Sequence, residues 1–380
     1  GHKKWLLLFH GETNFTQLYG LNCVPDSQLK AFVDYLTDTL GSPDRHIIAA
    51  NEGNAVALAA GYHLATGKIP CVYLQNSGLG NIVNPVVSLL SEKVYQIPCV
   101  FVIGWRGEPG LHDEPQHLFQ GAITLETLNL LGIEHMVIDK ETTEKQLSEK
   151  MVCFKKSLDS GKSVAFVVKR DGLSYDNTPV YKNRYSARRE DIIHSIVKVA
   201  KDDLIIATTG KTARELFEIR KREKQPHHCD FLTVGSMGHS SSIALGVALN
   251  QPERRVWCID GDGAALMHMG AMATIGALSP PNFIHVLVNN EAHESVGGQP
   301  TVASKIDFCG IARGCGYSSV FQAVTLEEFE SMLSDIQGTP GPIFIEVKSA
   351  IGSRSDLGRP TSTPVENKEA FMSNLRGVTK

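Results

Sequence analysis

Residues 256–264 read Val-Trp-Cys-Ile-Asp-Gly-Asp-Gly-Ala, and 25 residues separate Gly263 from an Asn-Asn pair that ends at Asn290. The apolar start of this stretch predicts a buried strand, and its glycines predict a tight turn. The interval has room for one helix and one further strand, residues 283–288. Because strands joined by a helix run parallel, we expect Asp262 and Asn290 at the carboxyl ends of two neighbouring strands.

The rest of the chain repeats this alternation of short apolar runs and longer helical stretches. β-Branched runs predict strands, and Ala/Leu-rich stretches predict helices. The expected strands are 69–74, 99–103, 163–168, 204–207, 255–259, 283–288 and 342–347, and the expected helices are 28–39, 54–65, 189–200, 211–222, 240–249, 264–278 and 326–336. The pattern is typical of an α/β protein whose helices cover both faces of parallel sheets.

The length of 380 residues fits two domains at about 150 residues each. The polar stretch 176–188 predicts a linker between a first domain at 1–175 and a second at 189–380.

A shared spacing relates the two halves. Seventeen positions separate Gly61 from Gly78, and the same number separates Gly246 from Gly263. The match favours two α/β domains of one design, although a single matched window is also compatible with chance.

The amino-acid composition limits the classes of partner that the protein is expected to bind. Apolar residues make up 42%, charged residues 21%, and the formal net charge is −4, as in ordinary globular proteins. Nucleic acid needs a basic face and a membrane span needs about 20 apolar residues, so neither partner is expected. The apolar part of 3–9 is shorter than the about 7–15 residues of a signal peptide. Eight cysteines without a C-x-x-C pair favour a reducing cytoplasm.

The residues around Asp262 and Asn290 suit a metal and a phosphate group. A carboxylate and an amide oxygen are ligands that Mg²⁺ accepts, and the ion completes its shell with phosphates and water. The glycines on either side of Asp262 let backbone N–H groups approach a diphosphate, and the expected helix from Ala264 adds its positive end. Each motif alone is more often a tight turn or a helix cap, but their order along the chain favours the metal site.

Two other polar clusters bear a weaker resemblance to a phosphate-binding loop and to a metal site, respectively. Residues 209–212, Thr-Gly-Lys-Thr, match the end of a phosphate-binding loop, but Ile205 stands where its first glycine belongs. This stretch is better explained as another loop near the diphosphate. The acidic and histidine residues of 112–117 match no standard metal spacing, and Pro115 interrupts any helix face, so a surface loop is expected there.

The spacing GDG-x25-NN resembles the cofactor motif of the decarboxylase-type thiamine-diphosphate enzymes. The resemblance implies that Asp262, Asn290 and the backbone carbonyl of Ala292 bind Mg²⁺. Residues 234–238 resemble the loop that supports the bent cofactor, with Met237 as the wedge between its rings; plain core packing is the alternative for Met237. The remaining implied cofactor contacts are Gly210, Lys211, Gly235, Gly261, Gly263 and Ala264.

Two acidic residues in the first half match catalytic positions of that family. Glu52, at the start of an expected helix, resembles the glutamate that protonates the aminopyrimidine of the cofactor. A first-turn charge that complements the helix dipole is the alternative. Asp26 resembles an aspartate that faces the substrate, and a helix N-cap is the alternative for it.

Longer stretches narrow the resemblance to the phosphonopyruvate decarboxylases, a family close to the sulfopyruvate decarboxylases. The stretches that carry it are 24–27, 75–85, 104–110, 113–117, 293–301 and 352–360. The resemblance implies two doubly wound parallel-sheet α/β domains of the thiamine-diphosphate-binding fold, with no central third domain. It also implies decarboxylation of 3-phosphonopyruvate to phosphonoacetaldehyde.

Charge and loop position predict the residues that hold the phosphonate. A doubly charged phosphonate needs cationic or multidentate donors. The expected donors are His293, Gln299, Arg354 and Arg359, with Lys305 and Arg106 as further choices. Each is more often a solvated residue or a structural ion pair, and Arg354 and Arg359 would equally serve to tie the C-terminal segment to its domain.

The resemblance further implies a homo-oligomer, at least a dimer, whose sites combine Glu52 of one chain with Asp262 of another. A sulfopyruvate decarboxylase, another 2-oxo acid decarboxylase or a carboligase would use the same cofactor. A non-catalytic subunit is disfavoured because Glu52, Asp262 and Asn290 are all present. A dinucleotide-binding dehydrogenase ranks last, since no G-x-G-x-x-G follows the first expected strand.

Overall fold

The computed structural model describes residues 21–23, 26–40, 46–294 and 297–377. Residues 3–9, in which no targeting signal is expected, lie outside these ranges. The chain divides after Val180 into two compact units, which we call unit 1 and unit 2. The assignment of 176–188 to a linker stays a prediction.

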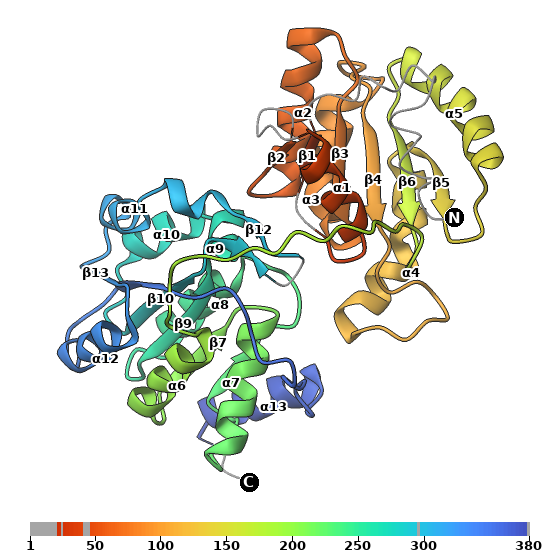
Figure 1. The fold of residues 1–380 in the computed structure, drawn as a ribbon. Coiled ribbons are helices and arrows are strands. Elements are labelled where there is room, and N and C mark those ends of the chain that lie inside the picture. The colour runs from red at the N-terminus through yellow and green to blue at the C-terminus, as the bar shows by residue number, and fades with distance from the viewer. Residues whose placement is uncertain (1–20, 24–25, 41–45, 295–296, 378–380) are drawn as a thin grey trace. The chain divides into compact units, whose positions relative to one another are not determined.

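Unit 1 is built on a parallel sheet of six strands in the order β2-β1-β3-β4-β6-β5 (Figure 1). Its strands are β1 (Leu21–Cys23), β2 (His46–Ile48), β3 (Cys71–Gln75), β4 (Val100–Gly104), β5 (Glu134–Ile138) and β6 (Val164–Val168). Its helices are α1 (Lys30–Leu40), α2 (Glu52–Thr66), α3 (Leu79–Pro85), α4 (Pro115–Leu130) and α5 (Glu144–Asp159).

Both faces of this sheet are covered, which explains the continuous apolar runs of its central strands. Tyr73 and Phe166 lie in a core with side chains of α1 and α5, whereas Val72 and Phe101 lie in a second core with α2, α3 and α4. Because neighbouring strand residues point to opposite faces, each central strand contributes to both cores.

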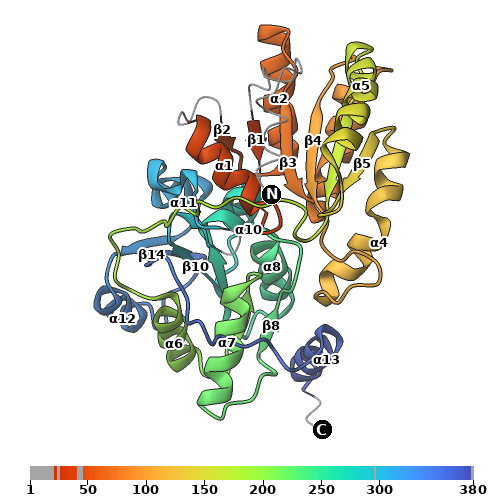
Figure 2. The same cartoon turned by 45° about the vertical axis from the view of Figure 1, so that its right-hand side comes forward.

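Unit 2 has a second parallel sheet, in the order β13-β14-β10-β9-β7-β8 (Figure 2). Its strands are β7 (Leu204–Ala207), β8 (Asp230–Leu232), β9 (Val256–Gly261), β10 (Phe283–Asn289), β13 (Ser319–Ala323) and β14 (Ile343–Lys348), with a small antiparallel hairpin of β11 (Ala292–His293) and β12 (Gln299–Pro300). Its helices are α6 (Arg189–Ala200), α7 (Lys211–Arg222), α8 (Ser240–Asn250), α9 (Asp262–Met267), α10 (Gly270–Leu278), α11 (Phe308–Cys315), α12 (Leu326–Asp335) and α13 (Pro364–Leu375).

The two units share one topology. When the strands of each unit are counted from its own first strand, both sheets have the order 2-1-3-4-6-5. The third strand is β3 in unit 1 and β9 in unit 2, and the matched glycines Gly78 and Gly263 follow these two strands. The expected pair of doubly wound domains is confirmed, and the described residues form no third domain.

One expected helix is divided in two. The stretch 264–278 was expected to be continuous, but α9 ends at Met267 and α10 begins at Gly270. His268, at the break, leaves helical geometry with φ −134° and ψ 50°. Its ring packs against the ring of His239, with 4.2 Å between the centroids.

None of the described helices combines the length and the apolar character that a membrane crossing requires.

A buried ion pair joins α7 to β8 in unit 2. The guanidinium of Arg220 donates from Nε and Nη2 to the two carboxylate oxygens of Asp230, each at 2.9 Å. The two side chains are 3% and 0% exposed, so water cannot replace either partner. Removing one partner therefore leaves an uncompensated charge in the protein interior.

We expect Asp230→Ala to lower the free energy of unfolding by about 3–5 kcal/mol, the usual cost of breaking a buried pair. Urea denaturation measures the change. The matched control is Asp159→Ala, which breaks an exposed pair with Lys155 and should cost less than about 1 kcal/mol. Equal losses of unfolding free energy in the two variants would contradict the conclusion that burial makes the Arg220–Asp230 pair the more costly one to break.

Candidate active site

A cleft opens in unit 2 at the carboxyl ends of β7 and β9. The chain leaves these neighbouring strands toward opposite edges of the sheet, and ligands of open α/β sheets bind at such a point. The cleft is open to solvent. We call it the β7–β9 cleft. It is lined by Arg189, Thr208, Thr209, Lys211, Thr212, Met237, Gly261, Asp262, Gly263, Ala264, Val288, Asn290, Ala292, His293 and Glu294.

Most of the residues expected to bind cofactor and metal meet in this cleft. Those that line it are Lys211, Met237, Gly261, Asp262, Gly263, Ala264, Asn290 and Ala292. The other two lie next to lining residues: Gly210 precedes Lys211 at the start of α7, and Gly235 lies two residues before Met237. Their roles toward a ligand stay predictions.

Asp262 is a buried carboxylate that forms no ion pair with the described residues. It is 3% exposed, and its Oδ2 accepts a hydrogen bond of 2.5 Å from the hydroxyl of Thr301. Among the described residues, no Lys or Arg forms an ion pair with it. Burial raises its pKa to about 7, against the lowering effect of Thr301 and the Gly263 backbone. A bound cation would remove the cost of keeping this group ionised.

Parallel pairing brings Asn290 to the same edge. Gly261 of β9 lies opposite Val288 of β10, so Asp262 and Asn290 follow adjacent strand ends. The Asn290 carbonyl accepts a hydrogen bond of 2.9 Å from Asn183, and its side-chain oxygen accepts one of 3.1 Å from the Ala292 amide. An amide oxygen has a second lone pair, which leaves Asn290 able to bind a metal.

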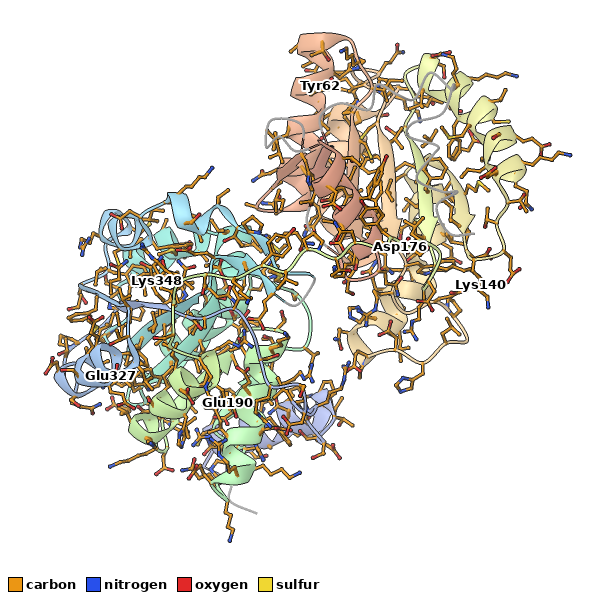
Figure 3. The ribbon with its side chains drawn as sticks, viewed as in Figure 1. Tyr62, Lys140, Asp176, Glu190, Glu327 and Lys348 are labelled. Atoms are coloured by element: carbon orange, nitrogen blue, oxygen red, sulfur yellow. The ribbon has the colours of Figure 1, made fainter. Side chains whose placement is uncertain are left out.

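The turn after Asn290 is held by Glu291. This residue has φ +61°, a left-handed conformation that costs energy for any side chain except glycine. Its carboxylate accepts hydrogen bonds from the Tyr185 hydroxyl at 2.8 Å and from Nζ of Lys348 at 3.3 Å. Lys348, which is labelled in Figure 3, is the last residue of β14 and also pairs with Glu346. These contacts offset the strain and orient the two residues on either side of Glu291.

The donor set fits Mg²⁺ and a diphosphate. The buried carboxylate of Asp262, the amide oxygen of Asn290 and the nearby Ala292 backbone are oxygen ligands for a hard cation. The N-terminus of α7 borders the same cleft, since Thr209, Lys211 and Thr212 line it. Backbone N–H groups at the start of a helix favour phosphate.

His293 and Gln299 face each other across the β11–β12 hairpin. Burial lowers the pKa of His293 to about 4, so the imidazole is neutral near pH 7. Gln299 is 1% exposed, and neither Nε2 nor Oε1 has a hydrogen-bond partner among the described residues. A buried amide without partners is costly, so a hydrogen bond from a group outside the described residues would lower that cost.

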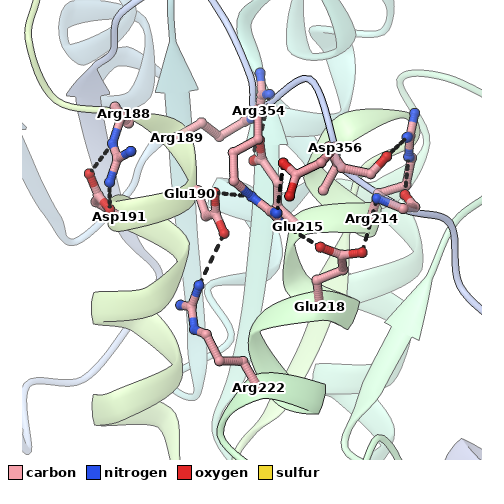
Figure 4. Close-up of polar contacts among 12 residues, drawn as sticks. Arg188, Arg189, Glu190, Asp191, Arg214, Glu215, Glu218, Arg222, Arg354 and Asp356 are labelled. Atoms are coloured by element: carbon pink, nitrogen blue, oxygen red, sulfur yellow. Dashed lines mark hydrogen bonds and ion pairs between the residues drawn. The ribbon is translucent and has the colours of Figure 1, made fainter.

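The two arginines expected to hold the phosphonate lie elsewhere in unit 2. Arg354 donates to Glu190 at 2.9 Å, to Asp356 at 3.1 Å and to Glu218, as Figure 4 shows. These contacts join the C-terminal segment to α6 and α7, which favours the structural alternative for Arg354. Arg359 is an exposed residue of the same segment, and Lys305 is exposed on a short helical turn.

In unit 1, Glu52 begins α2 and is 5% exposed. Its Oε2 accepts a hydrogen bond of 2.8 Å from Nδ2 of Asn81. Gly78 is required beside it, because a Cβ at that position would lie 2.4 Å from Oε1. The N-cap of α2 is Asn51, whose side chain accepts from the Asn54 backbone. Glu52 is therefore held in a defined orientation by groups outside its own helix.

Asp26 lies near the carboxyl end of β3 and is fully buried. It precedes the first residue of α1 by four positions, and its Oδ1 accepts a hydrogen bond of 2.8 Å from Gln75. Burial raises its pKa. Arg106 reaches toward Ser27 at 3.4 Å, but its Nε and Nη2 donate to Asp113, so the one acidic residue of this pair in 112–117 has a structural role.

Sequence reasoning missed three residues of the β7–β9 cleft region. Thr301 and Glu294 entered the sequence analysis only as parts of the longer stretch 293–301, and Arg189 only as the start of an expected helix, without a role for any of them. Glu294 follows the expected ligand His293 directly, and its charge was the signal that would have found it. Arg189 comes from the start of α6 and could not be placed near the cleft without the sheet order.

The pKa of Asp262 predicts how the metal-free protein responds to pH. The pKa of about 7 in the folded protein lies above the ordinary value of an aspartate, 3.8, so the folded state binds the proton more tightly than the unfolded chain does. The free energy of unfolding in EDTA should therefore fall as pH rises from about 4 to about 7, by about 1.4 kcal/mol per unit of pKa difference at most.

Urea denaturation in EDTA across this range measures the effect, with Asp262→Asn as the control that cannot ionise. The two proteins should differ less in the pH dependence of their free energy of unfolding when Mg²⁺ is added. Parallel pH curves for the two proteins would contradict the burial argument.

Comparison with known proteins agrees with this geometry. Residues 20–129 match the family model of the N-terminal thiamine pyrophosphate-binding domain of thiamine pyrophosphate enzymes, and residues 208–347 match that of the C-terminal binding domain. Thiamine pyrophosphate is another name for thiamine diphosphate. The two matches fall in unit 1 and unit 2, respectively.

Three curated relatives are similar to the chain. Phosphonopyruvate decarboxylase of Streptomyces viridochromogenes is 35% identical, over 86% of this chain and 84% of the relative. Sulfopyruvate decarboxylase of Methanosarcina acetivorans is 29% identical, over 85% of this chain and 86% of the relative. Sulfopyruvate decarboxylase subunit beta of Methanothermobacter thermautotrophicus is 37% identical, over 50% of this chain and 97% of the relative.

The cofactor is therefore thiamine diphosphate, and the chain is a carboxy-lyase. With a match to each half of the cofactor-binding fold and a relative that is similar along both units, it belongs to the thiamine-diphosphate-dependent 2-oxo acid decarboxylases.

Proposed function

We propose that the protein decarboxylates 3-phosphonopyruvate to phosphonoacetaldehyde and CO₂, with thiamine diphosphate and Mg²⁺. The observation that carries the choice of substrate is the 35% identity to a phosphonopyruvate decarboxylase along both units. Sulfopyruvate decarboxylase is the rival, because one relative of that name is also similar along both units, at 29% identity. The two acids differ in charge, since a phosphonate carries a second negative charge near neutral pH.

The metal and the diphosphate would lie in the β7–β9 cleft. Asp262, Asn290 and the Ala292 carbonyl would hold Mg²⁺, and the start of α7 with Lys211 would hold the diphosphate. Met237, which lines the cleft, would support the bent cofactor. The bound cofactor supplies a nucleophilic carbon and an electron sink for the decarboxylation.

Glu52 is the proposed proton carrier. Asn81 donates to Oε2, whereas Oε1 faces Gly78, so the two oxygens have different surroundings. We infer that Oε1 gives and takes the proton at the aminopyrimidine, while Asn81 keeps the carboxyl group oriented. Asp26, whose pKa is raised by burial, would face the substrate.

The substrate's phosphonate would be bound by neutral donors of the β11–β12 hairpin. His293 is uncharged near pH 7, and the buried amide of Gln299 lacks a partner among the described residues. A ligand oxygen that accepts from Nε2 of Gln299 would satisfy that group. We do not assign this role to Arg354, because three carboxylates already accept from its guanidinium.

The first test is Glu52→Gln, which keeps the shape and removes the exchangeable carboxyl proton. We expect kcat for 3-phosphonopyruvate to fall by about 10²–10⁴. Binding of thiamine diphosphate, followed by calorimetry, should persist. Glu149→Gln, an exposed change in the same unit, is the control. Wild-type turnover in Glu52→Gln would contradict the assignment of the proton carrier.

The second test concerns the substrate. We expect kcat/KM for 3-phosphonopyruvate to exceed the values for sulfopyruvate and pyruvate. Gln299→Ala should raise KM for 3-phosphonopyruvate more than it lowers kcat, because it removes a binding contact to a group that does not react. A preference for sulfopyruvate would overturn the substrate and leave the cofactor assignment in place.

We also infer that the protein is a homo-oligomer, at least a dimer, whose complete site combines Glu52 of one copy with Asp262 of another. The test mixes Glu52→Gln with Asp262→Ala, each inactive alone, under conditions that allow subunit exchange. Mixed dimers contain one intact site, so activity should return. No recovery, with exchange verified by mass measurement, would show that each copy uses its own two residues.

A further inference from the structure

The cationic side chains of the β7–β9 cleft already share an anionic partner. Glu294 accepts a hydrogen bond of 2.9 Å from Nη1 of Arg189 and one of 2.8 Å from Nζ of Lys211. Its Oε2 also accepts from Nδ2 of Asn290 at 2.8 Å. One carboxylate thus joins α6, the start of α7 and the proposed metal-binding turn.

The Glu294 carboxylate is held in its ionised form by the two cations that it contacts, because ion pairs with Arg189 and Lys211 stabilise the negative charge. Its side chain is 8% exposed, so solvent screens its charge only weakly. Arg189 is not available to neutralise it fully, because Nε and Nη2 donate to Glu215 at 2.7 and 2.9 Å.

The balance of charge in the cleft consequently disfavours a free diphosphate. Arg189 and Lys211 supply two positive charges, and the carboxylates that pair with them, Glu215 and Glu294, supply two negative ones. The two cations are therefore balanced before a ligand enters. A diphosphate brings several further negative charges into a site of low dielectric. A divalent cation beside Asp262 would supply the missing positive charge to the cleft. His293, which also lines it, is neutral near pH 7.

We propose that Glu294 makes the cleft select the metal complex of the cofactor's diphosphate over the free diphosphate. It does so by cancelling the attraction of Arg189 and Lys211 until a divalent cation is present. The proposal rests on the proposed placement of the diphosphate and metal in this cleft. Glu294 is a specificity-determining residue in this account and takes no part in proton transfer.

Calorimetric titration of the full chain with inorganic pyrophosphate tests the proposal without turnover. The dissociation constant is measured once in EDTA and once in excess Mg²⁺, and their ratio is the metal dependence. Glu294→Gln keeps the size of the side chain and removes its charge. We expect at least a tenfold tighter binding in EDTA and a metal dependence reduced at least tenfold. Thiamine diphosphate should give the same trend.

A matched control and a second variant separate the effect of the Glu294 charge from the effect of its hydrogen bonds to Arg189 and Lys211. Glu218→Gln makes the same charge change on α7, where the side chain pairs with Arg354 and does not line the cleft. Its metal dependence should equal that of the wild type. Glu294→Ala removes both charge and hydrogen bonds, and the proposal predicts that it too binds pyrophosphate more tightly in EDTA. Thermal unfolding checks that each variant is folded.

Three outcomes would count against the account in different ways. Unchanged binding in EDTA for a folded Glu294 variant would overturn the selectivity role. Weaker binding of both variants in EDTA and in Mg²⁺ would also overturn it, and would make Glu294 an anchor for Arg189 and Lys211. If the wild type binds neither pyrophosphate nor thiamine diphosphate in Mg²⁺, the proposed cofactor site itself is wrong.

Discussion

The parallel pairing of β9 with β10 is the constraint on which the site in unit 2 depends. This pairing places the residues after Gly261 and Asn289 at one edge of the sheet, although 25 residues separate the two motifs. Asp262 is thereby buried where no Lys or Arg of the described residues neutralises it. The fold stabilises this arrangement through apolar packing on both faces of the sheet and leaves the carboxylate available to a cation.

The chain surrounds this carboxylate with groups that have fixed partners. Thr301 donates to Asp262, Tyr185 and Lys348 hold Glu291, and Glu294 holds Lys211. Such contacts orient polar groups before any ligand arrives, which reduces the reorganisation that binding requires. In unit 1, Glu52 is likewise oriented by the chain itself, through the hydrogen bond from Asn81 and the space left by Gly78.

The sequence predicts the central strands well, because β3, β4, β6, β9, β10 and β14 are continuous apolar runs. It misses β5 and β13, whose side chains are mostly only half-buried, and it misses α5, which is rich in charged residues. Local motifs likewise predict that Asp262 and Asn290 lie at the carboxyl ends of neighbouring strands. They cannot reveal that Arg189 and Glu294 meet or that Arg354 pairs with Glu190, because those contacts depend on how distant elements pack.

The most direct measurement of the central claim is a competition between two acids in one vessel. Equal amounts of 3-phosphonopyruvate and sulfopyruvate are supplied with thiamine diphosphate and Mg²⁺, and phosphorus and proton NMR follow both products. The account predicts that phosphonoacetaldehyde forms first and that neither product forms when thiamine diphosphate is withheld. Preferential formation of the sulfonate product would contradict the proposed substrate, and product formation without thiamine diphosphate would contradict the account as a whole.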